Sequence, residues 1–267
     1  MALHGFDMDR DCILINLIAD LTKKERGAAP TERQLQSLLR DANDEHAKRT
    51  GRYLFDRPFY PSGPDGYVMR TSHSDISDLC GLGIDLDWLR AFVFGSDAWE
   101  RPWNDDWRPL EIYTATYVAN RCLEEDSPIN INVLQAVMWF ADAYFMDTNG
   151  TRLLFEPFEP GVLGPRLSSV ACRFGCHGVM DICSHYKMGT TSFGEDRESL
   201  ARSAIDEILP HCLSIAEVST WDLLNRTRGP NGSWNEACER GKKYIDGPTS
   251  DDLGPLFEED IAPVPER

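Results

Sequence analysis

The sequence predicts a mainly α-helical protein with short β elements, built from two related helical units in tandem. Three observations lead to this fold class: helical spacing of apolar residues, helix-capping patterns and an internal repeat. A Leu-Gln segment at Leu35 recurs at Leu134, and each copy continues to a glycine, Gly51 or Gly150, and then to a short apolar stretch. Both pairs lie 99 residues apart (134 − 35 and 150 − 51). A constant offset over such a stretch is typical of tandem repeats.

The first unit, residues 1–107, is expected to open with two helices. Apolar residues recur at helical spacing over 8–25, and a Gly-Ala-Ala-Pro segment then ends the pattern. Thr31, followed three residues later by Gln34, has the pattern of a capping box. A second helix should therefore run from Thr31 to about Thr50, where the next glycine ends it.

Less regular structure should complete this unit. Residues 53–55 are short and β-favouring, whereas 60–66 are rich in proline and glycine and predict a loop. Residues 95–109 place tryptophans among Gly, Pro, Asn and Asp. This composition predicts a linker packed onto the body of the protein, with a domain boundary near 107.

The second unit, residues 108–249, should be largely helical. Its main helices are expected over 111–123, 132–146, 197–212 and 215–226. A hairpin-like stretch is expected over 150–158, and a further helix should begin at Gly164-Pro165, because proline is tolerated in a first helical turn. Residues 250–267 are acidic and contain several prolines, so they are expected to form a flexible tail, although Leu256-Phe257 could dock.

Composition narrows the function. With 42% hydrophobic and 27% charged residues, the 267-residue chain has the composition of a soluble globular protein. Its apolar runs are too short to span a bilayer, so no membrane partner is expected. Eight cysteines are too sparse for a disulfide scaffold, which favours a cytoplasmic location. The formal charge of −17 opposes direct binding to nucleic acid, which needs clustered Lys and Arg.

Three ordered stretches of the second unit carry a family resemblance. They are Tyr117–Asn120 with Leu134–Ala141, Leu154–Glu159 with Gly164-Pro165, and Trp221–Arg228 with Gly232–Trp234. In order and spacing over residues 110–240, they resemble the Panacea family of SocA-like antitoxin domains. The chain departs from the family pattern where Arg228 replaces a usual histidine and where Pro160–Leu163 lacks a usual tryptophan. The first unit resembles a degenerate copy that keeps only the front half.

The resemblance implies a protein that inhibits another protein by direct contact. Panacea-like antitoxins neutralise unrelated toxins, so the expected partner is a toxin or a defence protein, and no enzymatic activity is expected. Apolar residues at helical spacing are first of all core residues. The residues that carry the resemblance, and that we assign to motif and core positions, are Leu134, Gln135, Trp139, Phe155, Glu156, Phe158, Gly164, Pro165, Trp221 and Thr227.

Partner contacts are expected from tryptophans and one arginine, because these side chains dominate the energetics of protein interfaces. The candidates are Trp99, Trp103, Trp107, Arg228 and Trp234. Core packing is an equally good interpretation of each tryptophan.

One cluster has the side chains of a zinc site: Cys172, Cys176, His177 and Cys183. Zinc takes thiolate and imidazole ligands, but this spacing does not match common zinc motifs, and small buried apolar positions are the favoured interpretation of the cysteines. Cys176 and His177 would make a poor nucleophile–base pair, because adjacent helical residues point about 100° apart. We therefore expect no cofactor.

Two alternative functions stay open. The acidity of the chain would suit a phage-encoded inhibitor of a host defence complex that covers a basic nucleic-acid site. The other alternative is a metal-dependent enzyme centred on the four cysteine and histidine residues.

Overall fold

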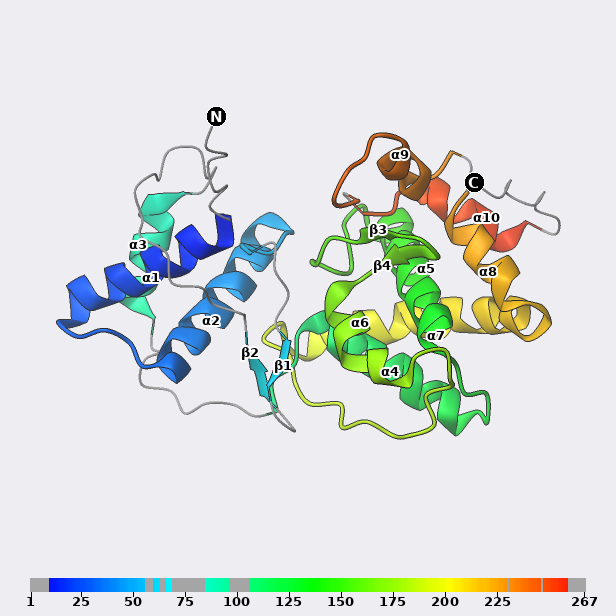
Figure 1. The fold of residues 1–267 in the computed structure, drawn as a ribbon, viewed down its shortest axis with the longest axis horizontal. Helices are drawn as coiled ribbons and strands as arrows, with labels where there is room; N and C mark the ends of the chain where they lie inside the picture. The colour runs from blue at the N-terminus through cyan, green and yellow to red at the C-terminus, as the bar shows by residue number, and fades with distance from the viewer. Residues whose placement is uncertain are drawn as a thin grey trace, which may run out of the picture. The chain divides into compact units, whose positions relative to one another are not determined.

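The computed structural model describes residues 10–55, 60–62, 66–68, 85–96, 106–229, 231–245 and 247–258. The chain divides into two compact units, residues 1–105 and 106–267. Within these residues, helices dominate both units, and the strands form two short antiparallel hairpins (Figure 1). The predicted fold class, mainly α with short β elements, is confirmed. No described helix is both long enough and apolar enough to cross a membrane.

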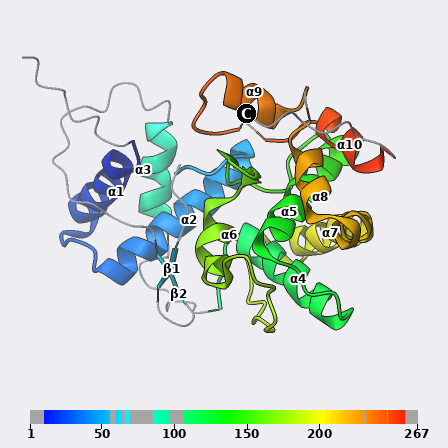
Figure 2. The same cartoon turned by 45° about the vertical axis from the view of Figure 1, so that its right-hand side comes forward.

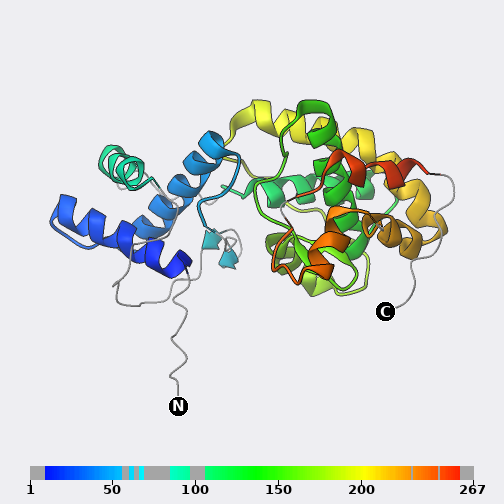
Figure 3. The same cartoon turned by 90° about the horizontal axis from the view of Figure 1, so that it is seen from above.

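Three helices make up the described core of the first unit. They are α1 (Arg10–Arg26), α2 (Glu32–Thr50) and α3 (Leu86–Gly95), and each packs against the other two (Figure 3). Leu14, Leu38 and Leu89, one from each helix, are fully buried or nearly so. The predicted start of α2 is confirmed, because Thr31 and Gln34 form both hydrogen bonds of a capping box.

The β structure of this unit lies later in the chain than expected. Residues 53–55 form no strand, because the Asn43 side chain rather than a partner strand accepts the Phe55 amide, at 3.1 Å. The predicted loop at 60–66 instead contributes to a hairpin of β1 (Tyr60–Ser62) and β2 (Gly66–Val68). In a two-stranded sheet every strand is an edge strand, where proline is tolerated.

The second unit is built around α5 (Ile131–Asn149), on which Trp139 and Phe140 are fully buried. Helix α5 packs against α4 (Leu110–Glu124), α6 (Ser168–Phe174), α7 (Gly194–Val218) and α8 (Thr220–Thr227) (Figure 1). The shorter elements are β3 (Glu159–Gly161), β4 (Gly164–Arg166), η1 (Gly175–His177), α9 (Ser233–Glu239), η2 (Ser250–Asp252) and α10 (Gly254–Phe257).

The hairpin of this unit also lies later than expected. Residues 150–158 form no hairpin, whereas β3 and β4 pair directly, with Pro160 opposite Pro165. Gly164-Pro165 therefore belongs to a strand and does not begin a helix. The backbone of Gly164 has φ +135°, which a right-handed helix does not allow, and α6 begins only at Ser168.

The break between the last two long helices is also shifted. We expected one helix to end at Cys212 and the next to begin at Ile215, but α7 continues through both to Val218. The chain breaks at Ser219, which has an extended backbone and whose hydroxyl accepts the Asp222 amide at 3.1 Å. This N-cap, rather than residues 213–214, sets the start of α8.

The prediction of a flexible tail from residue 250 is wrong for residues 250–258. The Asp252 carboxylate accepts hydrogen bonds from the backbone and hydroxyl groups of both Ser233 and Thr249, and Leu256 is buried. The Arg226 guanidinium donates to the carbonyl oxygens of Pro255 and Glu258, so α10 is held against α8 (Figure 2). The rest of the predicted tail, 259–267, lies outside the described residues.

Candidate functional site

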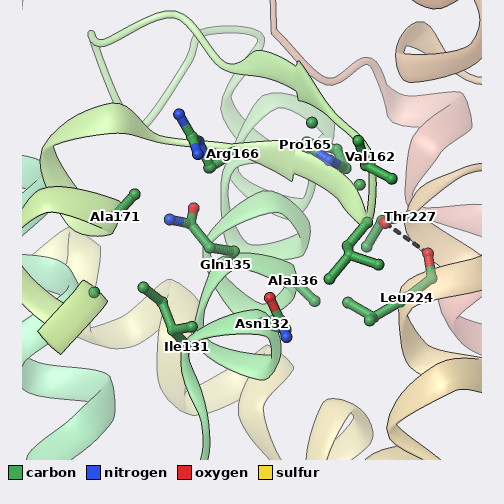
Figure 4. Close-up of a pocket in the computed structure, with 14 residues that line it drawn as sticks. Ile131, Asn132, Gln135, Ala136, Val162, Pro165, Arg166, Ala171, Leu224 and Thr227 are labelled. Carbon is green, nitrogen blue, oxygen red and sulfur yellow. Dashed lines mark hydrogen bonds between the residues drawn. The ribbon is translucent and has the colours of Figure 1, made fainter. Parts of the chain in front are cut away.

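A cavity of about 380 Å³ lies beneath the β3–β4 hairpin (Figure 4). Residues 161–166 of the hairpin form one wall, and the first turns of α5 form another. Helix α6 contributes Ala171, and α8 contributes Leu224 and Thr227. The lining is mostly apolar, with a small number of polar side chains, which is the usual character of a ligand-binding pocket.

Four residues that carry the family resemblance line this one cavity, although they lie far apart in the sequence: Gln135, Gly164, Pro165 and Thr227. Two of them fix its shape. The Gln135 carboxamide accepts the Leu167 amide at 2.9 Å and donates to the Leu167 carbonyl at 3.1 Å, which ties α5 to the end of the hairpin. A Cβ on Gly164 would lie 2.6 Å from the Thr227 hydroxyl oxygen, so hairpin and α8 meet at a position that only glycine fits.

The rim of the cavity carries exposed apolar side chains. Val162 and Leu163 form the turn of the hairpin and are 89% and 42% exposed. Between two glycines in the sequence, this apolar pair is the signal that could have identified the rim. Asn132 lines the opposite side, and its carboxamide makes no hydrogen bond to any other described residue.

Beside the cavity, an arginine lies between two tryptophans. The Arg228 guanidinium carbon is 4.7 Å from the ring centroid of Trp221 and 5.8 Å from that of Trp234. The Trp234 indole donates to the Gly161 carbonyl at 3.1 Å, and Gly161 belongs to the cavity wall. Arg228 directly follows Thr227, another wall residue. We call Trp221, Arg228 and Trp234 the Trp–Arg–Trp cluster.

Arg228 is short of anionic partners. Its guanidinium donates to the Asn225 side chain, but its buried Nε has no hydrogen-bond partner among the described residues. No carboxylate of the described chain pairs with it. Burial lowers the pKa of Arg228 below its usual value, yet a guanidinium stays charged at neutral pH. The cluster therefore presents a positive charge held in place by two aromatic rings.

Trp221 lies where the sequence did not place it, whereas Trp107 follows the core-packing alternative and not the partner-contact one. Trp221, which we assigned to the core, is 50% exposed, because α8 packs through Leu223 and Thr227 instead. Trp107, a candidate for partner contact, is 5% exposed, and its indole donates to the Ser192 hydroxyl at 2.8 Å. Trp99 and Trp103 lie outside the described residues.

The remaining motif residues are in the core of the unit: Leu134, Trp139, Phe155, Glu156 and Phe158 are all at most 7% exposed.

Glu156 belongs to a buried acid pair that the sequence did not reveal. Glu111, on α4, accepts the Phe155 and Glu156 amides at 2.9 and 3.0 Å, while Glu156 accepts the Ser169 amide at 3.0 Å and the Ser169 hydroxyl. Burial, and then the nearby Glu111, raise the pKa of Glu156 to about 8. These contacts join α4, the motif segment and α6, so the pair stabilises the frame of the cavity.

The candidate zinc ligands are not brought together. Cys172, Cys176 and Cys183 are exposed, so the interpretation that they are buried apolar residues is wrong. His177 lies 2.5 Å from the hydroxyl of Tyr186. Within the described residues, no group of three or more His, Cys, Asp or Glu side chains is arranged to hold a metal ion.

Comparison of the chain with models of protein families, with curated proteins and with solved structures finds no match in any of the three. The resemblance to Panacea domains therefore rests on the sequence motifs alone.

Proposed function

We propose that the protein is a non-catalytic inhibitor that neutralises a protein partner by direct contact, as the Panacea-like antitoxins it resembles do. One observation carries the proposal. Motif residues from three distant stretches, Gln135, Gly164-Pro165 and Thr227, line a single apolar cavity with exposed apolar side chains at its rim. Exposed apolar patches around a pocket are typical of surfaces that bind other proteins.

The polar groups of the cavity support binding over catalysis. Both ends of the Gln135 carboxamide bond to Leu167, the Thr227 hydroxyl donates to the Leu224 carbonyl, and Arg166 pairs with Glu159 at 2.9 Å. These side chains are engaged in holding the hairpin and α8. A catalytic site would instead place a nucleophile, a base and an orienting group within reach of one another.

The test is co-expression with a toxic neighbouring gene, followed by co-purification. We expect the chain to restore growth and to form a stoichiometric complex. Val162→Asp should weaken both, because it places a charge in the exposed hairpin turn without disturbing the core. Val179→Asp is the matched control, since Val179 is 83% exposed but does not line the cavity. Failure of the unaltered chain to rescue growth and to form a complex would refute the proposal.

A second candidate function rests on the charge of −17. In this version the protein inhibits a defence complex by covering a basic nucleic-acid site with its acidic surface. Such binding should weaken strongly as salt rises, because exposed charges are screened within about 8 Å at physiological ionic strength. Binding through the apolar cavity should depend on salt only weakly. A salt titration of the purified complex separates the two candidates.

A further inference from the structure

We propose that the cavity and the Trp–Arg–Trp cluster act as one recognition site for an extended peptide segment of the partner. In this segment an apolar side chain fills the cavity and a neighbouring carboxylate pairs with Arg228. The inference rests on the proposed function, because it names what the inhibitor recognises.

The cavity suits one side chain or two. Its volume of about 380 Å³ lies near the lower end of the range for small-ligand pockets, about 300–1,000 Å³. The walls contributed by Ala136, Ala171 and Leu224 are apolar, so burial of an apolar side chain is favourable there.

A peptide backbone would find a hydrogen-bonding group at the rim. The Asn132 carboxamide lines the cavity and makes no hydrogen bond to another described residue. An amide side chain can both donate to and accept from a peptide unit, so it can hold an extended chain on either side of its anchor residue.

The charge of the site indicates that the ligand carries a carboxylate. The protein is strongly acidic overall, yet at this edge Arg228 is held between Trp221 and Trp234 and pairs with no described carboxylate. A guanidinium that aromatic rings hold by cation–π contacts is pre-organised for a carboxylate, which it can bind through two parallel hydrogen bonds. Nucleic acid would also satisfy the arginine, but a net charge of −17 repels it.

Cavity and cluster share their connecting residues. Trp234 bonds to Gly161, a wall residue, and Arg228 follows Thr227, another wall residue. The carboxylate and the apolar side chain should therefore belong to adjacent or nearly adjacent residues of one segment.

The test uses the full chain and three short blocked peptides, Gly-Phe-Asp-Gly, Gly-Phe-Asn-Gly and Gly-Ala-Asp-Gly. Binding is followed by calorimetry and by the indole resonances of the tryptophans. We expect saturable binding of the Phe-Asp peptide with a Kd of about 1 mM or below, and at least about tenfold weaker binding of the other two. Absence of binding, or equal binding of the Phe-Asp and Phe-Asn peptides, overturns the proposal.

Three variants locate the site. Arg228→Gln should remove the preference for Asp over Asn while the apolar contribution persists. Ala171→Leu should fill the cavity and weaken all peptides that carry phenylalanine. Arg121→Gln is the matched control, because this arginine is already paired with Glu125 and does not line the cavity, so the preference for Asp should survive. Thermal melts check that each variant is folded.

The outcome is separable from that of the proposed function. Growth rescue without any preference for a carboxylate refutes the peptide site and leaves the inhibitor standing. Selective peptide binding without growth rescue supports the peptide site and refutes the inhibitor function. Self-association of the chain that Val162→Asp abolishes would assign this face to a second copy and would overturn the peptide site.

Discussion

Asn43 and Asp142 occupy equivalent positions in the two units, and each accepts a hydrogen bond from the segment that follows its own helix. Asn43 accepts the Phe55 amide at 3.1 Å, and Asp142 accepts the Leu154 amide at 3.1 Å. Both acceptors and both donors are 99 residues apart (142 − 43 and 154 − 55). In each unit, a polar side chain on the second long helix thus replaces a partner strand for the segment that follows that helix.

The same offset runs through the neighbouring elements. Helices α2 and α5 begin and end 99 residues apart (131 − 32 and 149 − 50), and each is followed by a left-handed glycine, Gly51 with φ 74° and Gly150 with φ 67°. Strand β3 begins 99 residues after β1 (159 − 60). The repeat in the sequence is therefore also a structural repeat: each copy has a long helix, a glycine cap, a helix side chain that binds the following segment, and a hairpin.

Asn43 is neutral and Asp142 is charged, and this difference gives the first prediction. Asp142 also pairs with Arg152 at 2.8 Å, whereas Tyr53 occupies the position equivalent to Arg152. Asp142→Asn should lower the free energy of unfolding by about 3 kcal/mol, since it leaves a largely buried Arg152 without its carboxylate. Asn43→Asp should also destabilise, because it places a carboxylate at a buried position where a neutral amide side chain now accepts the Phe55 amide. Urea denaturation measures both variants, and unchanged midpoints would show that the charge difference between Asn43 and Asp142 does not affect stability.

A second prediction concerns pH. Below about pH 8, folded Glu156 holds a proton that the unfolded chain releases above the ordinary glutamate pKa. Its contribution to stability is therefore fully present at low pH and is lost as the pH rises toward 8. Glu156→Gln should remove this dependence, so that the variant loses less stability than the parent between about pH 5 and pH 8.

The control for this experiment is Glu207→Gln, because Glu207 is exposed on α7. Its stability profile with pH should follow that of the parent chain. Parallel profiles for the parent and Glu156→Gln would mean that Glu156 is already ionised in the folded protein.

Two glycines of the cavity give a matched pair for the third prediction. Gly164→Ala should destabilise by about 1–3 kcal/mol, because φ +135° is unfavourable for alanine and the new Cβ would contact the Thr227 hydroxyl. Gly175→Ala should be close to neutral, since a Cβ there meets no atom within 4 Å. The midpoint of thermal unfolding should fall for the first variant only. Equal effects of the two would argue against a tight contact between hairpin and α8.

Capping residues in the sequence predicted the ends of the long helix α2, but the sequence did not predict the cavity. The Thr31–Gln34 capping box and the glycines after α2 and α5 act on neighbouring residues, so their effect can be read from the chain. Which face of α8 points outward is decided by packing against α5 and α7, and helical spacing alone did not reveal that Trp221 is exposed. The sequence did suggest Arg228 and Trp234 as separate candidates for partner contact, but the cavity between three distant segments required the fold.

The last prediction links the C-terminal segment to the site. Asp252 accepts four hydrogen bonds, two of them from Ser233, and the next residue along α9 is Trp234 of the cluster. Asp252→Ala should destabilise by about 2–3 kcal/mol, because it leaves these donors without their acceptor. Loss of this anchor should also loosen Trp234 from Gly161 and shift the tryptophan fluorescence to longer wavelength. Asp251→Ala is the control, since Asp251 is exposed, and it should change neither stability nor fluorescence. A destabilised Asp252→Ala with unaltered fluorescence would mean that the segment supports α9 without positioning the cluster.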